Sequence, residues 1–423
     1  MNIQTDALNT HAGKPEHSLS RAYSLSERYQ QVRDNSLLLC APLQTEDFVV
    51  QQHAEVSPPK WHLAHTTWFF EQAILKQFDS DYQVFNEDYA RLFNSYYKSA
   101  GTHWLQSERG QLSRPTVDEI YDYRRFVDER LLRLLDEEIS NTELLAVLEL
   151  GLNHEQQHQE LLLMDIKRIL ATNLSMPAYS DAHWSAPVVA ERWTEFPEGV
   201  YEIGHQGDTF AYDNEMPRHK QYLHSFSIRD NSVTCEEFIE FIDAGGYSNP
   251  GLWLSLGWDW VQNNQISAPF YWFKQDGIWH QYTLHGVKPV SAHEPVVHVS
   301  YFEADAFARW KGYRLPVEAE LEIWLEEQPE MLSPRTALLH PNRAEQAINQ
   351  VWYWTASHYS PYPGYRPYSG MLGEYNGKFM CNQFVLRGGC VATPAGHYRS
   401  SYRNFYQPEQ RWMFSGIKLA KHR

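Results

Sequence analysis

Residues 153–170, NHEQQHQELLLMDIKRIL, place two histidines four positions apart in a segment that otherwise favours a buried helix. Residues at positions i and i+4 project from the same face of an α-helix, so His154 and His158 can converge on one point. Val147 and Leu150 lie close to the same stripe, which places both imidazoles on the apolar face. The stretch therefore predicts a long helix that buries a pair of histidines.

Most of the first 170 residues have the pattern of helices. The helical stretches are residues 24–40, 58–78, 116–138 and 140–170. Thr116 lies three positions before Glu119, the spacing of a capping box, and Ser140 stands at the same distance before Glu143. Four helices with connections of varied length predict a helical bundle, inside which facing side chains can build a metal site.

The pattern changes after residue 175 to short apolar runs broken by Gly, Pro and Asn. Residues 199–204, 226–230, 296–301 and 384–389 favour strands, and residues 234–242 and 301–312 favour helices. The fold class expected for the whole chain is α+β. The expected organisation is a tail at residues 1–20, a helical bundle at 21–175, a linker at 176–190 and a second domain at 191–423.

Charge and composition exclude several classes of protein. The formal net charge is −17 and no long basic run is present, which argues against a nucleic-acid partner. The four cysteines are widely spaced and include no C-x-x-C pair, so neither a disulfide framework nor a cysteine zinc site is expected. No apolar signal segment opens the chain, and no run of about eighteen apolar residues predicts a membrane span. These features predict a cytoplasmic protein that acts on small molecules.

A third metal ligand for the histidine pair is expected from residues 61–71, WHLAHTTWFFE. His62 and His65 are both candidates. Trp61 and Trp68 flank His65 at helical spacing, which favours His65 on the inward face, with His62 in a structural role. A single inward histidine is usually a hydrogen-bonded core residue, but burying several imidazoles without partners is costly, and coordination satisfies one nitrogen of each ring.

Two metals fit three neutral histidines. The set leaves a divalent ion its full charge and open positions, which suits a redox iron, and zinc accepts the same ligands. The motif H-E-x-x-H at residues 154–158 is also the signature of a zinc protease helix, in which Glu155 would be the general base. The third ligand of such enzymes usually follows the motif, and no obvious downstream partner is present. The zinc hydrolase therefore stays as an alternative.

Longer motifs resemble one known family. Residues 57–71, 92–101, 112–116 and 153–163 read SPPKWHLAHTTWFFE, LFNSYYKSAG, LSRPT and NHEQQHQELLL, and together resemble the DinB-like bundle of the ergothioneine-forming sulfoxide synthases, the EgtB family. In the second half, DNEMPRH, EADAFARWKGYRLPVEAELE, VLRGG and YRNFYQPEQRWMFSGIKLA resemble the formylglycine-generating-enzyme-like domain of these synthases, a variant of the C-type lectin fold. The resemblance covers nearly the whole chain in the expected order.

The resemblance implies an enzyme with mononuclear non-haem Fe(II). Members of the family use O2 to join a cysteine-type thiol to the imidazole C2 of hercynine (trimethylhistidine), giving a sulfoxide. The iron ligands that it implies are His65, His154 and His158. Gln157 and Asn404 match positions that hold hercynine in relatives, where amide groups orient the imidazole.

Tyr96 and Tyr97 match a tyrosine pair in the branch of the family that uses free cysteine. A phenol at the site can supply a proton and bias the reaction toward C–S bond formation over simple thiol oxidation. Arg114 in LSRPT is a candidate partner for the carboxylate of the thiol substrate, with an ordinary surface salt bridge as the alternative.

The residues after Asn404 bear on the choice of thiol. Phe405 and Tyr406 are expected to wall the trimethylammonium group of hercynine by cation–π attraction, with core packing as the alternative. Other branches carry a Trp–Asp pair after the asparagine and an arginine four residues beyond the Asp. Here Phe405, Tyr406 and Gln410 stand at those positions, which points toward cysteine and away from γ-glutamyl-cysteine.

Other activities of the same superfamily stay open on the sequence. They are a selenoneine-type synthase and a C5-specific synthase. From a different class, the chain fits a non-catalytic metal-binding or lectin-like module in which the histidines hold structural zinc. The paired C-terminal cysteines that bind copper in formylglycine-generating enzymes are missing from residues 396–405, GHYRSSYRNF, so peptide-cysteine oxidation is not expected.

Overall fold

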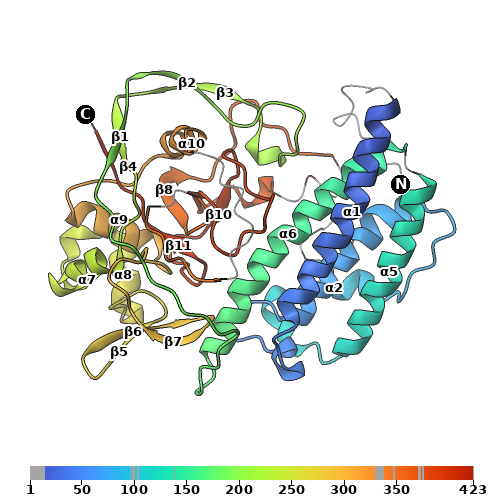
Figure 1. Cartoon of the computed structure of the whole chain (residues 1–423), viewed down its shortest axis with the longest axis horizontal. Coiled ribbons are helices and arrows are strands. Elements are labelled where there is room, and N and C mark those ends of the chain that lie inside the picture. Colours follow the sequence, from blue (N-terminus) through green and yellow to red (C-terminus); the bar gives the residue numbers. More distant parts are fainter. Residues whose placement is uncertain are drawn as a thin grey trace. The chain divides into compact units, whose positions relative to one another are not determined.

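The computed structural model describes residues 15–95, 97, 101, 104–138, 140–328, 338–345, 348–369, 373 and 376–422, with side chains from residue 25 onward. The chain divides into two compact units (Figure 1). A helical unit comprises residues 1–173 and 367–376, and a mixed unit comprises residues 174–366 and 377–423. The α+β class is confirmed, and the helical unit includes a segment from late in the chain that the sequence had not indicated.

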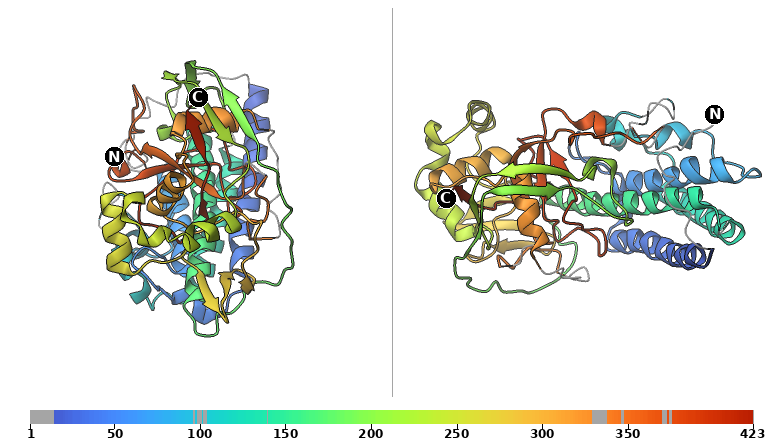
Figure 2. Two further views of the ribbon diagram at one scale, coloured as in Figure 1. Left: turned by 90° about the vertical axis from the view of Figure 1, so that its left-hand side faces the viewer. Right: turned by 90° about the horizontal axis from the view of Figure 1, so that it is seen from above.

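The helical unit is built on four long helices, α1 (Pro15–Cys40), α2 (Pro59–Phe70), α5 (Val117–Glu137) and α6 (Thr142–Ala171). Helix α6 packs against α1 and α2, and α2 also packs against α5, so the long helices lie side by side (Figure 1 and Figure 2). The connections contain η1 (Thr45–Val49), a π-helical turn η2 (Glu71–Leu75), α3 (Lys76–Phe78), α4 (Tyr89–Leu92) and η4 (Gln106–Gln111). Among the described helices, none is both long and apolar enough to cross a lipid bilayer.

The ends of the helices confirm one capping box and correct another. The Thr116 hydroxyl accepts from the Glu119 backbone N–H at 3.2 Å, as expected. At the start of α6 the N-cap is Asn141, whose side chain accepts from Leu144 N–H at 3.1 Å, so the predicted capping role of Ser140 was wrong. Helix α1 begins at Pro15, so residues 15–20 are helical.

Close packing of α6 on α2 sets the depth at which the histidines lie. Gly151 of α6 faces Phe70 of α2, and a Cβ atom at this glycine would lie 2.6 Å from the Phe70 ring. Phe70 in turn meets the edge of Tyr29 from α1, with ring centroids 5.1 Å apart. A side chain at position 151 would therefore push the two helices apart just before His154.

The mixed unit contains small sheets with helices around them. Its strands are β1 (Trp193–Phe196), β2 (Gly199–Ile203), β3 (His219–Leu223), β4 (Phe226–Arg229), β5 (Trp272–Gln275), β6 (Ile278–Thr283), β7 (Gly286–Pro289), β8 (Trp352–His358), β9 (Phe384–Arg387), β10 (Asn404–Tyr406), β11 (Ser415–Gly416) and β12 (Ala420–His422). The sheet orders are β1-β4-β12, β2-β3, β5-β6-β7 and β10-β9-β8-β11. Its longer helices are α7 (Cys235–Asp243), α8 (Ser255–Asn264), α9 (Tyr301–Trp310) and α10 (Glu318–Glu326), and α10 packs against β4, β8 and β9.

Most expected elements of the second half are present, with one exception. Strands β2, β4 and β9 and helices α7 and α9 lie where the sequence predicted them. The strand expected at residues 296–301 is not formed. His298 adopts a φ of 65°, and its Nδ1 lies 2.7 Å from the carbonyl oxygen of Met413. A positive φ interrupts the extended backbone that a strand requires, so this apolar run is irregular and buried.

Candidate metal centre

Three histidines of the helical unit form a cluster in which two are buried and the third, His158, is half-buried. His65 comes from α2, and His154 and His158 come from α6. One ring nitrogen from each lies within 4.8 Å of the other two. In the described part of the chain, this is the one group of three or more His, Cys, Asp or Glu side chains placed to hold a metal ion. The spacing on α6 and the inward face of α2 thus bring the three predicted ligands together.

His65 is fixed in orientation by its surroundings. Its Nδ1 donates to the carbonyl oxygen of Phe93 at 2.6 Å. Trp61 stacks on its ring at 4.5 Å between centroids, and Trp68 stacks at 5.5 Å. Because Nδ1 carries the proton, Nε2 holds a lone pair, and this buried atom has no hydrogen-bond partner among the described residues. Such an atom is costly in a fold unless it has a ligand.

His62 lies next to the cluster and contacts one of its members. Its Nδ1 is 2.9 Å from Nδ1 of His158, and its Nε2 is 3.0 Å from Oδ2 of Asp165. The same carboxylate oxygen accepts the backbone N–H of Ser57 at 2.9 Å. Both nitrogens of His62 are therefore engaged with protein groups, which agrees with the structural role expected for it.

Burial keeps the cluster neutral. It lowers the pKa of His154 to about 3, against a weak opposing effect of Glu155. Burial also lowers the pKa of His65 and of His158 well below the usual value, and the neighbouring histidines add to the shift. Neutral imidazole is the form that binds metals. Three neutral imidazoles and one unpartnered lone pair fit a divalent ion such as iron or zinc.

The glutamate of the H-E-x-x-H motif faces a different group of residues. Arg33 Nη1 donates to Oε2 of Glu155 at 2.9 Å, and Arg124 Nη2 donates to Oε1 at 2.9 Å. The Ser36 hydroxyl donates to Oε1 at 2.6 Å. Burial would raise the pKa of Glu155, but the two arginines hold it at about 2. A carboxylate bound in this way is unsuited to take a proton from water at neutral pH, which argues against the zinc hydrolase.

Of the predicted tyrosines and Gln157, the structure describes Tyr97 and Gln157. Tyr97 is buried, and its ring centroid lies 6.5 Å from that of His65 and 5.6 Å from that of Trp68. Tyr96 lies outside the described residues. Gln157 is half-buried on α6, next to the second histidine of the motif.

Arg114 lies at the surface of the helical unit. Its side chain is exposed, and Nη1 donates to the carbonyl oxygen of Ser113 at 3.0 Å. This conformation satisfies part of the guanidinium at the surface. The structure gives no contact between Arg114 and the histidines.

Arg109 is a residue that the sequence reasoning missed. Its guanidinium carbon lies 3.3 Å from the ring centroid of Trp61, on which His65 also stacks. It donates to the hydroxyls of Ser57 at 2.7 Å and Ser95 at 2.8 Å. Its positive charge contributes to the lowered pKa of His65. No local pattern distinguishes Arg109 from Arg114, because Arg109 lies in the short η4 turn and Arg114 in the loop after it, and neither segment is long enough to mark an inward face by its period.

In the mixed unit, strand β10 carries three of the predicted residues. The Asn404 side chain accepts from the backbone N–H of Phe405 at 2.9 Å. The Phe405 ring stacks on Tyr359 at 4.1 Å, whereas Tyr406 packs against Trp412 at 5.8 Å. Side chains alternate along a strand, so Phe405 and Tyr406 point to opposite faces of β10. The strand therefore does not place both aromatic rings in one wall beside Asn404.

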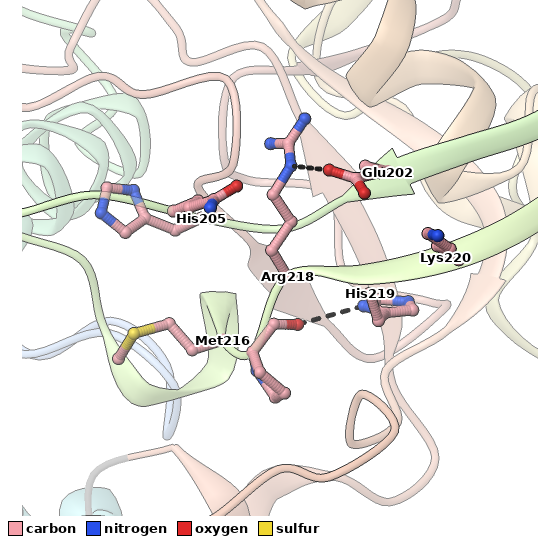
Figure 3. A pocket seen from close by; sticks show the side chains of 8 residues that line it. Glu202, His205, Met216, Arg218, His219 and Lys220 are labelled. Carbon is pink, nitrogen blue, oxygen red and sulfur yellow. Dashed lines mark hydrogen bonds and ion pairs between the residues drawn. The ribbon is translucent and has the colours of Figure 1, made fainter.

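An open hollow of about 500 Å³ lies beside β2 and β3 in the mixed unit. Residues lining it include Glu202, His205, Met216, Arg218, His219 and Lys220 (Figure 3). Arg218 donates to Glu202 at 3.4 Å and to the carbonyl of Gly204 at 2.9 Å. The hollow contains none of the predicted site residues, and its arginine is already paired, so the histidine cluster is the candidate site.

Comparisons with known proteins identify the family of the chain. Residues 28–162 match the model of the DinB superfamily, and residues 190–325 match the Sulfatase-modifying factor enzyme 1-like domain. The chain is 33% identical to the hercynine oxygenase of Mycolicibacterium smegmatis and 31% identical to that of Mycobacterium tuberculosis, covering 64% of this chain and 70% of the relative in both cases. It is 26% identical to ergothioneine biosynthesis protein 1 of Schizosaccharomyces pombe, over 50% of this chain and 28% of that protein. The chain therefore belongs to the hercynine oxygenase (EgtB) family, the oxidoreductases that act as sulfoxide synthases in ergothioneine biosynthesis.

Proposed function

We propose that this protein binds Fe(II) through His65, His154 and His158 and uses O2 to join cysteine to hercynine. The C–S bond forms between the cysteine sulfur and C2 of the hercynine imidazole, and the product is hercynylcysteine sulfoxide. One oxygen atom of O2 goes to sulfur, and the other leaves as water with the hydrogens of the S–H and C–H bonds. The observation that carries the proposal is the convergence of three neutral imidazoles, two of them buried and the third half-buried, in a chain of this family.

The neutral charge of the three histidines bears on what the metal ion can bind. Fe(II), when bound, supplies the redox chemistry that activates O2. The three imidazoles carry no negative charge, so they leave a divalent ion positive and favour an anionic substrate group such as a thiolate. Stacking of Trp61 and Trp68 on His65 keeps water from its ring.

Arg109 supports an amino-acid thiol as the substrate. Its guanidinium is held over Trp61, close to His65, by hydrogen bonds to two serines. A fixed positive charge beside the metal ligands favours a carboxylate at the same place. Within this proposal Arg109 takes the role that was expected for Arg114.

Hercynine contacts are proposed for Gln157 and Asn404. Their amide groups have the hydrogen-bonding capacity to orient an imidazole. Phe405 is proposed to contact the trimethylammonium group, although its ring is already stacked on Tyr359. Tyr406, which packs against Trp412, is the weaker candidate for this contact.

The proposal is tested with protein purified without oxygen and loaded with Fe(II). Oxygen uptake is measured with hercynine and cysteine, and the product is identified by mass spectrometry. We expect one O2 consumed for each sulfoxide formed. Zn(II)-loaded protein and the His154→Ala variant are the controls, and both should be inactive.

The products also separate the alternatives. Loss of the imidazole C2 proton, read by NMR, agrees with the proposal, whereas loss of the C5 proton would identify a C5-specific synthase. A higher kcat/KM with selenocysteine than with cysteine would favour a selenoneine-type synthase. An Fe(II) protein that consumes no oxygen with either donor would contradict the proposal and leave a binding module as the better description.

A further inference from the structure

His62 and Asp165 lie directly behind His158, and the proposed function assigns them no role. His62 Nδ1 lies 2.9 Å from His158 Nδ1, and His62 Nε2 lies 3.0 Å from Asp165 Oδ2. His62 and Asp165 each expose only 3% of their surface. The chain of contacts runs from a carboxylate through one imidazole to a second imidazole, with Asp165 anchored by the backbone N–H of Ser57.

The contacts determine where the protons lie. A carboxylate accepts hydrogen bonds, so His62 donates its Nε2 proton to Asp165. A neutral His62 then has a lone pair on Nδ1. Two nitrogens 2.9 Å apart need one proton between them, so His158 must donate from its own Nδ1. This leaves the lone pair of His158 on Nε2, the nitrogen that remains for the cluster.

His65 and His158 differ in the group that their Nδ1 atoms contact. His65 Nδ1 donates to a neutral backbone carbonyl, that of Phe93. His158 Nδ1 meets an imidazole that is itself bound to a carboxylate. A hydrogen bond toward negative charge orients a ligating imidazole and raises its basicity. His158 is therefore the better electron donor of these two ligands.

We propose that His62 and Asp165 are positioning residues that fix the protonation of His158 and strengthen its binding of the metal ion. This inference rests on the metal site proposed above. The proposal distinguishes His62 from a residue that only packs, because a ring of similar size without a hydrogen-bond acceptor would fill the space and lose the effect. His62 also meets Trp61 edge to face at 5.8 Å between ring centroids, so packing is the competing explanation.

The test uses Co(II) as a spectroscopic probe for the metal and three variants of the full-length protein. His62→Phe keeps a ring and removes the acceptor. His62→Gln restores an amide oxygen that can accept the Nδ1 proton of His158. Asp165→Asn keeps the side-chain shape and removes the charge. The dissociation constant of Co(II) is measured by competition with a chelator, and the visible absorption spectrum reports the ligand field.

We expect His62→Phe and Asp165→Asn to weaken Co(II) binding about 10- to 100-fold and to shift the visible bands. His62→Gln should recover a large part of the affinity. Circular dichroism and the thermal midpoint without metal show whether each variant is folded. If His62→Phe does not fold, the comparison of Asp165→Asn with the wild type decides, because the inference requires Asp165→Asn to bind Co(II) more weakly.

Two patterns of failure are distinct. Wild-type affinity and an unchanged spectrum in folded His62→Phe or in Asp165→Asn would overturn the inference while leaving the metal site intact. Equal Co(II) binding by the wild type and His154→Ala would instead overturn the metal site, and the inference with it.

Discussion

His65 donates its Nδ1 proton to the backbone carbonyl of Phe93, with 2.6 Å between the nitrogen and the oxygen. A loop that follows α4 thus sets the protonation of a side chain on α2. The carbonyl fixes one tautomer of His65, and this tautomer directs the lone pair of Nε2 away from Phe93.

The first prediction concerns the metal content of ligand variants. His65→Ala, His154→Ala and His158→Ala should each retain almost no Fe(II) after loading and desalting, because each removes one of three converging nitrogens. Elemental analysis measures the iron, and circular dichroism measures the helix content, which should be kept. His53→Ala is the matched control, since His53 is exposed and lies outside the cluster. Full occupancy in His154→Ala would contradict the ligand set.

The second prediction concerns the ion pairs of Glu155. Glu155→Gln leaves Arg33 and Arg124 buried with less compensation, so the free energy of unfolding should fall by about 3–5 kcal/mol. Asp122→Asn, which breaks an exposed pair with Arg125, should cost less than about 1 kcal/mol. Urea unfolding followed by circular dichroism measures both. The folded fraction of Glu155→Gln should keep its oxygenase activity, whereas a zinc hydrolase would lose its catalytic base.

The third prediction concerns pH and Lys167. This lysine is fully buried on α6, and burial lowers its pKa to about 7. The unfolded chain holds the proton up to about pH 10.4, so between about pH 7 and pH 10 the unfolded state binds more protons than the native state. The stability of the native state should therefore rise with pH in this window, by up to about 1.4 kcal/mol per pH unit.

Lys167→Met should remove this slope and stabilise the protein most at pH 7. Thermal midpoints from circular dichroism between pH 7 and pH 9.5 measure the difference between the variant and the wild type. Lys76→Met is the control, because Lys76 is exposed on the same unit and should give a curve parallel to the wild type. Parallel curves for Lys167→Met would show that the buried amine does not titrate in this range.

The fourth prediction concerns the thiol substrate. Cysteine should have a kcat/KM at least about tenfold higher than γ-glutamyl-cysteine, since loss of one charged contact is worth roughly that factor. Tyr406 and Gln410 replace the acid and the base expected for the longer thiol. Tyr406 is packed against Trp412, and Gln410 accepts from the backbone N–H of Gln407 at 3.0 Å. Steady-state oxygen uptake with each thiol decides the preference, and a higher value for γ-glutamyl-cysteine would show that other residues hold it.

The fifth prediction concerns the tyrosine pair. Tyr96→Phe should keep the fold and the iron and shift the products from the sulfoxide toward cysteine sulfinic acid, because the hydroxyl is the proposed proton source. Tyr97→Phe is the matched variant and should shift the products less. Mass spectrometry counts both products against the oxygen consumed. An unchanged ratio and rate in Tyr96→Phe would remove the hydroxyl from the mechanism.

The parts of the site that could be predicted depend on local periodicity. His154 and His158 share a helix face by spacing alone, and the aromatic neighbours of His65 marked its inward side. Local patterns also located three of the strands in the mixed unit. In a periodic helix or strand, the spacing of apolar residues indicates which face is buried.

What could not be predicted depends on contacts between distant segments. The partner of His62 is Asp165, which is 103 positions away, and no pattern in either helix pairs them. Arg109 turns inward because Ser57, Ser95 and Trp61 meet it, although its own segment has no periodicity. The left-handed conformation of His298 replaced a predicted strand because the ring bonds to Met413.

The ion network around Glu155 also constrains how this chain can evolve. Replacing Glu155, Arg33 or Arg124 alone leaves a buried charge without full compensation and lowers the stability of the fold. Replacing all three by apolar side chains of similar volume can leave the stability unchanged. These positions are therefore epistatic, and a path from this protein to a hydrolase that uses the same motif crosses a fitness valley of several substitutions. Under the proposed function, the histidines of H-E-x-x-H bind the metal ion, whereas the glutamate stabilises the fold through its two arginines.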